Sequence, residues 1–257
     1  MTKLIDAHCH LQDERILPRL PDVIERAREA GVERMICCGT REKDWDAVLR
    51  LKEQYPGIIF PAFGLHPWYV KDRSSGWLNT LRGFLEAVPS AVGEIGLDHA
   101  LENFNEAEQT EIFGTQLELA REHGRPVVIH CRRAWEALAG ILERTGPLEH
   151  GGIIHSYSGP AELIPGLMKF GLSFSFSGSV TRAGNRRARK ALGAVPPDRL
   201  LAETDSPDIL PEGMDGVNEP ANLVRVVKEI AALRGFSEEE AARVTSENAR
   251  KIFFTAE

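Results

Sequence analysis

The opening run of the chain constrains its fold and its chemistry more than any other segment. The run from Lys3 to His10, KLIDAHCH, is typical of a buried strand and ends in two histidines. Alternate residues of a strand point to the same side, so His8 and His10 are expected to project together where the strand ends. Two neutral imidazoles that converge on one point make half of a transition-metal site.

Four later strand-like runs also carry a histidine or an acidic residue at or near their ends. A buried charge is costly unless it is paired or bound to metal, so the repetition of this pattern indicates one shared site. Together with the first strand, these runs supply His8, His10, Glu94, His130, His155 and Asp205.

Strand and helix patterns alternate along the whole chain of 257 residues. Eight strands, each followed by a helix, predict an α/β fold of the TIM (β/α)8 barrel type, a single domain over residues 1–257. A doubly wound open sheet is the rival, but it more often has a glycine-rich turn after its first strand. The predicted strands are 3–9, 33–39, 58–65, 91–97, 126–131, 152–156, 172–177 and 199–204, and the predicted helices are 21–30, 43–55, 76–88, 105–123, 133–145, 161–170, 186–195, 221–233 and 238–254.

The composition is that of a soluble globular protein, with 42% hydrophobic and 27% charged residues. We find no apolar run of about 18 residues and no signal-peptide pattern, and therefore expect no membrane span. The four cysteines match no zinc motif, and we expect reduced thiols in a cytoplasmic protein. The net charge of −7 disfavours a broad nucleic-acid surface, so any phosphate must be held locally by metal and a few arginines.

Four histidines and two carboxylates are more ligands than one metal ion needs. We therefore predict two divalent ions, with Glu94 as the bridge between them. His8, His10 and Asp205 complete one site, and His130 and His155 the other. Two such ions, about 3.5–4 Å apart, activate water and stabilise a leaving oxygen, and Asp205 is the candidate catalytic base beside Glu94. Histidine ligation favours zinc or manganese, and phosphate chemistry often uses magnesium.

Several motifs resemble the TatD family of metal-dependent deoxyribonucleases, and the resemblance spans nearly the whole chain in order. His99 and Tyr157 depart mildly from the family pattern, and neither is a predicted ligand. The resemblance implies an amidohydrolase-like TIM barrel and places the family's metal ligands on the six residues chosen above. The motifs are DAHCHL (6–11), GLHP (64–67), GEIGLD (93–98), VIHCR (128–132), HSYSG (155–159), ETDSP (203–207), NEPANL (218–223) and NARKIF (248–253).

Substrate contacts are less constrained by the sequence. The resemblance suggests that His66 binds a substrate phosphate, although a packed or capping histidine is equally compatible. Arg132 follows His130 and is suited to clamp a phosphate bidentately, with a surface ion pair as the alternative. Arg182 and Arg186 are candidate contacts to a DNA backbone, or part of a solvated helix face. Trp68 is a candidate for stacking on a base, with rim packing as the alternative.

The leading functional hypothesis is a metal-dependent phosphodiesterase that cleaves DNA, acting as a monomer on single strands or ends. The alternatives are an amidohydrolase-type enzyme for an amide or lactone, or a metal-binding protein without turnover. Many two-metal relatives of the amidase type bridge their ions with a carboxylated lysine. The fourth predicted strand offers Glu94 and no lysine, which favours the deoxyribonuclease.

Overall fold

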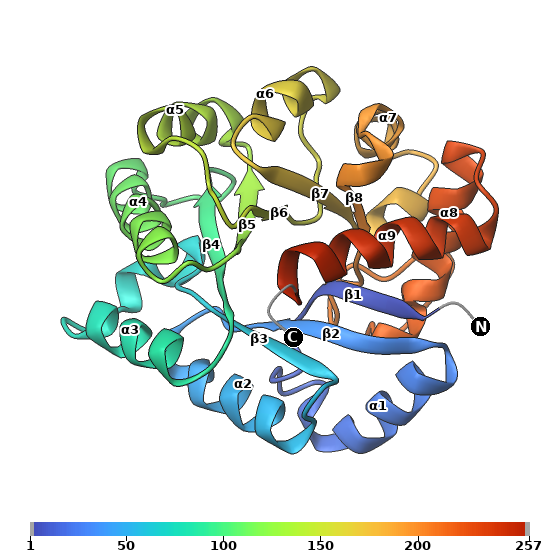
Figure 1. Cartoon of the computed structure of the whole chain (residues 1–257), viewed down its shortest axis with the longest axis horizontal. Helices are drawn as coiled ribbons and strands as arrows, with labels where there is room; N and C mark the ends of the chain where they lie inside the picture. The colour runs from blue at the N-terminus through green and yellow to red at the C-terminus, as the bar shows by residue number, and fades with distance from the viewer. Residues whose placement is uncertain (1–2, 255–257) are drawn as a thin grey trace.

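The computed structural model describes residues 3–254, so the ends of the predicted domain, residues 1–2 and 255–257, lie outside the described part. Eight parallel strands form a ring that alternates with an outer layer of helices (Figure 1). The strands are β1 (Leu4–Cys9), β2 (Val32–Cys38), β3 (Ile59–Phe63), β4 (Ala91–Asp98), β5 (Val127–Arg132), β6 (Gly152–Ile154), β7 (Leu172–Phe176) and β8 (Leu200–Ala202).

The strands pair in sequence order from β1 to β8, each parallel to the next. The last gap, between β8 and β1, is closed by a parallel bridge between Cys9, the last residue of β1, and Ser206, which lies beyond β8. The backbone N–H of Asp205 donates to the carbonyl of His8 at 3.0 Å, and that of His10 donates to Ser206 at 2.7 Å. The predicted TIM barrel is therefore confirmed, and its closure joins two of the predicted ligand segments.

The helices lie close to the predicted ranges. The main differences are at the beginnings of two helices, where a proline is present. The predicted helix 161–170 divides into a 3-10 turn (Ala161–Leu163) and a short α6, since Pro165 fits only the first turn of a helix. A 3-10 turn led by Pro220 likewise delays the start of α8. The helices are α1 (Leu20–Glu29), α2 (Glu42–Gln54), α3 (Trp77–Ala87), α4 (Glu106–Glu122), α5 (Trp135–Thr145), α6 (Ile164–Met168), α7 (Arg186–Ala194), α8 (Leu223–Arg234) and α9 (Glu238–Phe253).

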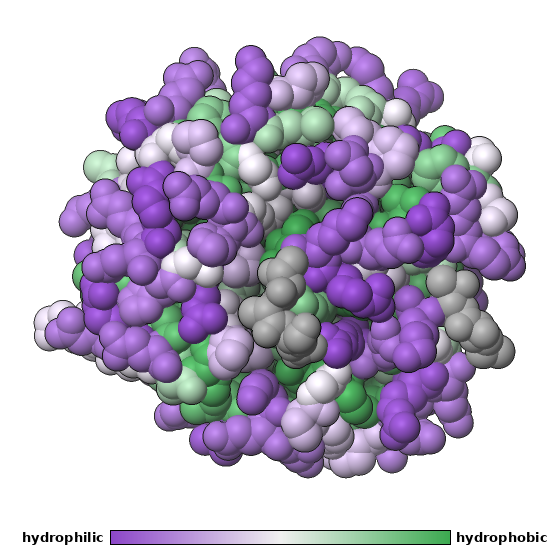
Figure 2. Space-filling view, viewed as in Figure 1, coloured by the Kyte–Doolittle hydropathy of each residue, from purple (hydrophilic) through white to green (hydrophobic). Residues whose placement is uncertain are grey.

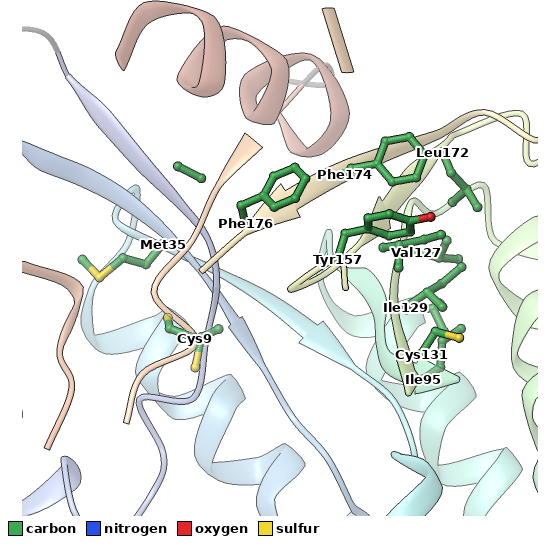
Figure 3. Packing of buried hydrophobic residues seen from close by; sticks show 14 of the residues in the cluster. Cys9, Met35, Ile95, Val127, Ile129, Cys131, Tyr157, Leu172, Phe174 and Phe176 are labelled. Atoms are coloured by element: carbon green, nitrogen blue, oxygen red, sulfur yellow. The ribbon is translucent and has the colours of Figure 1, made fainter. Parts of the chain in front are cut away.

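The apolar core has two layers because strand residues alternate between the inside and the outside of the barrel. The outer layer packs strands against helices; Figure 3 shows the part of it where Tyr157 lies edge-on to Phe174, with ring centroids 5.0 Å apart. The inner layer fills the barrel itself. Cys37 belongs to the outer layer and Cys38 to the inner one, so these neighbours point to opposite faces of the sheet.

Helix α9 closes the end of the barrel where the strands begin. Ala249, Phe253 and Phe254 pack against inner-layer residues near the strand starts, such as Ile5 and Ala91. Figure 1 shows α9 crossing in front of the barrel, and Figure 2 shows the same face with hydrophilic side chains over the surrounding helices. The opposite end, where the strands finish, is thereby left for the polar residues. Within residues 3–254, no helix combines the length and apolarity needed to cross a membrane.

Candidate metal centre

Glu94 lies at the centre of a buried polar cluster at the carboxyl ends of the strands. Its position inside β4 places its carboxylate in the barrel interior, where the residue is only 3% exposed. The two oxygens of this carboxylate face different histidines. Around Oε1 lie the Nε2 atom of His155 at 2.8 Å, Nδ1 of His130 at 3.1 Å and Nε2 of His66 at 3.2 Å.

The second oxygen of Glu94 faces the histidines that end β1. Oε2 lies 3.4 Å from the Nε2 atoms of both His8 and His10. Those two nitrogens are 3.0 Å apart, and Oδ1 of Asp205 lies 3.4 Å and 3.6 Å from them. The six predicted ligands therefore lie together, with His130 and His155 at one oxygen of Glu94 and His8 and His10 at the other.

His155 and Asp205 reach the cluster from just beyond their strands. The strands predicted at 152–156 and 199–204 end earlier, at Ile154 and Ala202. The backbone then turns through left-handed conformations, with φ of 43° at Ser156 and 55° at Asp205. Such conformations are costly for residues other than glycine and recur at functional sites, and aspartate tolerates them better than most residues.

Cys38 fixes the orientation of both rings at the end of β1. Its carbonyl lies 2.8 Å from Nδ1 of His10, and since a carbonyl only accepts, this nitrogen carries the proton. Its thiol sulfur lies 3.4 Å from Nδ1 of His8. The thiol also lies 3.9 Å from the carbonyl of Ile36, to which it can donate, so its lone pairs are free to accept from His8. When the rings are neutral, both Nε2 atoms then carry a lone pair directed at the centre of the cluster.

Buried carboxylates orient the other two predicted ligand histidines. Nε2 of His130 lies 3.1 Å from Oδ2 of Asp98, so this nitrogen is the donor and Nδ1 faces Glu94 with a lone pair. Nδ1 of His155 lies 3.5 Å from Oε1 of Glu203, and neither of these buried atoms has a hydrogen-bond partner within the described residues. The hydroxyl of Ser175 donates to the other oxygen of Glu203. A carboxylate behind a histidine is the usual support of a metal ligand.

His66 has the opposite tautomer. Its Nδ1 accepts the backbone N–H of Trp68 at 3.1 Å, so Nε2 carries the proton in the neutral ring. Desolvation by burial lowers the pKa of His66 to about 4 against the attraction of Glu94, which keeps the ring neutral near pH 7. The side chain therefore presents an N–H donor to the cluster, and a donor suits a phosphate oxygen better than a cation.

The electrostatics of the cluster favour charged carboxylates beside basic nitrogens. Burial opposes the charge on Glu94, but the surrounding imidazoles outweigh it and hold its pKa well below the usual value. Burial likewise disfavours charge on His10, yet the hydrogen bond to Asp205 and the charge of Glu94 raise its pKa to about 10. At His8, burial prevails and lowers the pKa. A cation that binds here must displace the ring protons of any charged imidazole.

This donor set fits divalent metal ions. Three subsets of the cluster hold ligand atoms that all lie within 4.8 Å of one another: His8, His10 and Glu94; His8, His155 and Asp205; and His66, Glu94 and His130. Four imidazole rings converge on two carboxylates without a lysine or arginine among them. Such a set suits zinc, manganese or iron, and its carboxylates also suit magnesium.

The predicted arginine contacts lie outside the cluster. Arg132 is the exposed last residue of β5, and Arg182 is exposed after β7, with its guanidinium donating to the carbonyl of Leu210 at 3.1 Å. Arg182 lines a hollow together with Asn185 and Glu212. Across residues 3–254, no hydrogen bond or ion pair joins either guanidinium to the histidines. Both arginines therefore lie apart from the histidines and carboxylates of the cluster, on the surface of the molecule.

The sequence reasoning assigned no role to Asp98, Glu203 or Cys38. Asp98 and Glu203 are acidic residues in apolar strand runs, the same signal that identified Glu94, and both side chains are completely buried. A systematic search for such acids would have found them. Cys38 gave no signal of this kind, since its role depends on the contacts of its thiol and its carbonyl with the neighbouring strand β1.

Comparison with known proteins agrees with this geometry. A family model described as TatD related DNase matches residues 5–254. An uncharacterized metal-dependent hydrolase, YabD of Bacillus subtilis, is 35% identical over 97% of this chain and 98% of its own length. A 3′-5′ ssDNA/RNA exonuclease, TatD of Pantoea vagans, is 37% identical over 90% of this chain and 92% of its own length.

Solved structures show the same architecture. The crystal structure of YJJV, a TatD homolog from Escherichia coli K12, has a TM-score of 0.92 and 31% identity and covers 98% of both chains. A phosphotriesterase homology protein from Escherichia coli, solved with phosphate in its active site, has a TM-score of 0.69 at 16% identity, covering 99% of both chains. At that level of identity the second likeness concerns the fold alone.

Proposed function

Because this chain belongs to the TatD family of metal-dependent hydrolases, we propose that it removes nucleotides from the 3′ end of single-stranded DNA or RNA. The observation that carries the proposal is the division of the histidines between the two oxygens of Glu94. A carboxylate with nitrogen donors on both oxygens is suited to bridge two cations. Two-metal sites of this kind are widespread among enzymes that cleave phosphate esters.

We assign one divalent ion to His8, His10, Asp205 and Glu94, and a second to Glu94, His130 and His155. Two ions held by this set would lower the pKa of a bound water and polarise a phosphoryl oxygen. Zinc, manganese and magnesium all suit the set. Asp98, Glu203 and Cys38 support it from behind by holding each ring in the tautomer that presents a lone pair.

Asp205 and His66 complete the chemistry from opposite sides of Glu94. Asp205 contacts His8 and His10 through Oδ1, and its second oxygen accepts the proton of the attacking water. His66 donates its Nε2–H to a nonbridging phosphate oxygen, which gains negative charge in the transition state. The burial of both side chains makes these interactions stronger than they are in water.

The exposed arginines bind the flanking phosphates in this proposal. Arg132 lies two residues after His130, and Arg182 directly follows the 3-10 turn Gly178–Thr181 after β7. With a net charge of −7, the chain attracts a polyanion only through such local positive groups. A short single-stranded segment suits this arrangement better than a long duplex.

Digestion of a labelled oligonucleotide tests the proposal. A single-stranded 20-mer labelled at its 5′ end should shorten stepwise when manganese is present, and the same strand labelled at its 3′ end should release its label in the first step. Chelator should abolish both reactions, and added metal should restore them. Internal fragments without terminal release would indicate an endonuclease. Intact DNA together with turnover of an amide or lactone would contradict the proposal and favour the amidohydrolase alternative.

We further propose a monomer in the cytoplasm. All four cysteines are free and buried, which is consistent with a reducing compartment. A barrel that closes on itself and carries its whole donor set on one chain needs no second subunit for the site. Mass measurement in solution tests the monomer, and fractionation of cells tests the location.

A further inference from the structure

Trp68 is the most exposed large apolar side chain in the described part of the chain, at 50%. The other three tryptophans are covered: Trp45 and Trp77 are buried, and Trp135 is half-buried. A single exposed apolar residue needs no explanation on its own. The position of Trp68 does need an explanation. This residue lies in the 3-10 turn that begins just after His66, beyond β3, at the end of the barrel that holds the predicted metal ligands.

The exposed indole is held firmly. Its Nε1–H donates to Oδ2 of Asp98 at 2.7 Å, and the backbone N–H of Trp68 donates to Nδ1 of His66 at 3.1 Å. The indole also lies edge-on to the His66 ring, with centroids 5.1 Å apart. Asp98 is fixed in turn, since Oδ1 accepts the backbone N–H of Ala100 at 2.8 Å and its own N–H donates to Gln109 at 2.9 Å.

The same interactions connect Trp68 to the metal ligands. Oδ2 of Asp98, which accepts the indole N–H, also lies 3.1 Å from Nε2 of His130. His66, which contacts the indole ring, lies 3.2 Å from Glu94. A single residue therefore separates the exposed, fixed indole from the predicted metal ligands: Asp98 lies between Trp68 and His130, and His66 lies between Trp68 and Glu94.

We propose that Trp68 is the platform on which the nucleobase beside the cleaved bond stacks, an inference that rests on the proposed nuclease function. Every base has an apolar face, so stacking on an aromatic ring supports binding of single strands without sequence preference. A ring that is already fixed loses little conformational entropy when a base covers it. The phosphate is then held by the ions assigned to Glu94 and by the Nε2–H of His66, and the base stacks on the exposed indole beside them.

A thermodynamic cycle that combines removal of the Trp68 ring with removal of the 3′-terminal base measures the stacking free energy. The protein is compared with its Trp68→Ala variant, both in the Asp205→Asn background loaded with manganese, so that the strand survives the measurement. The ligand is a short single strand with either an ordinary 3′-terminal nucleotide or an abasic one. Base removal should weaken the binding of the parent at least about fivefold and that of Trp68→Ala little, because the ring that the base covers is gone.

Two further variants separate stacking from support of the site. Trp68→Phe keeps a ring but cannot donate to Asp98, so it should retain most of the discrimination between the two strands. Val224→Ala removes another exposed apolar side chain, which is 40% exposed on α8, and should keep the full discrimination. Manganese content, measured for each protein, reports on any effect that passes through Asp98 to His130.

The results distinguish failure of the Trp68 stacking proposal from failure of the proposed nuclease function. Equal discrimination by the parent and Trp68→Ala overturns the platform, and so does discrimination that is lost only together with manganese. If the unmodified protein digests DNA in either case, the proposed function stands without the platform. If it neither digests nor binds a single strand, both the nuclease and the platform are overturned.

Discussion

At the residue scale, Asp205 carries the sharpest test of the chemistry. Asp205→Asn keeps the shape and a neutral oxygen near His8 and His10 but removes the charge and the basicity. General-base assistance typically contributes about 10²–10⁴-fold, so we expect kcat to fall by at least about 10²-fold with the fold retained. Single-turnover digestion of the oligonucleotide at saturating metal measures this. A fully metallated variant with near-normal kcat would mean that Asp205 is no more than a dispensable ligand.

Substitution of Cys38 tests whether a residue that contacts the predicted ligand histidines, without binding metal itself, affects the metal affinity of the site. Cys38→Ala leaves Nδ1 of His8 without its sulfur partner at 3.4 Å but keeps the carbonyl that holds His10. Loss of such a partner typically costs about 10–100-fold in metal affinity, and we expect a loss in this range, measured by titration of the metal-free protein. Cys38→Ser retains an acceptor and should recover most of it. Equal affinities of all three proteins would remove Cys38 from the support of the site.

At the element scale, the alternation of strand and helix patterns was sufficient to predict the barrel, and the rule that strand ends meet was sufficient to assemble the cluster. The sequence pattern does not predict features that depend on side-chain contacts between neighbouring segments. The tautomer of His66 depends on the turn that begins with Pro67, and the role of Cys38 depends on the way its thiol and carbonyl meet β1. Arg132 at the end of β5 and Arg182 after β7 are exposed, and no burial pattern restricts the direction of their side chains.

The contact between β4 and β5 should be sensitive to a single methyl group. A Cβ at Gly96 would lie 2.0 Å from the carbonyl oxygen of His130, and the φ of +140° at this residue disfavours any side chain. Gly96→Ala should therefore push apart the strands that carry Glu94 and His130. We expect a loss of at least about 1–3 kcal/mol in the free energy of unfolding, measured in urea, together with weaker metal binding.

Gly114 on α4 provides a matched control, since a Cβ there has nothing within 4 Å. Gly114→Ala should stabilise the protein by about 0.5–1 kcal/mol, because alanine is the better helix former. Metal binding should not change. Comparable destabilisation of both variants would show that Gly96 has no special role at the junction of the two strands.

At the scale of the whole molecule, one end of the barrel is closed by α9 and the other gathers buried polar groups. This division puts stability and chemistry at opposite ends, as is usual for TIM barrels. The cluster brings carboxylates and imidazoles out of water, so bound cations should contribute to the stability of the entire domain.

Metal removal should therefore lower the melting temperature. A ligand at 100 times its Kd stabilises the folded state by about 2.7 kcal/mol, which corresponds to at least about 5 °C for a domain of this size. Calorimetry of the chelator-treated protein, with and without added manganese, measures the shift. The shift should shrink in Glu94→Gln, whose amide is uncharged and a poor bridge. A melting temperature that does not respond to metal would mean that the cluster is stable through its own ion pairs.

Anomalous diffraction from crystals loaded with manganese tests whether Glu94 bridges two metal ions. We predict two peaks about 3.5–4 Å apart, on either side of this carboxylate. One peak should lie beside His8 and His10, and the other beside His130 and His155. A single peak at saturating manganese, or two peaks that share no oxygen of Glu94, would contradict this prediction.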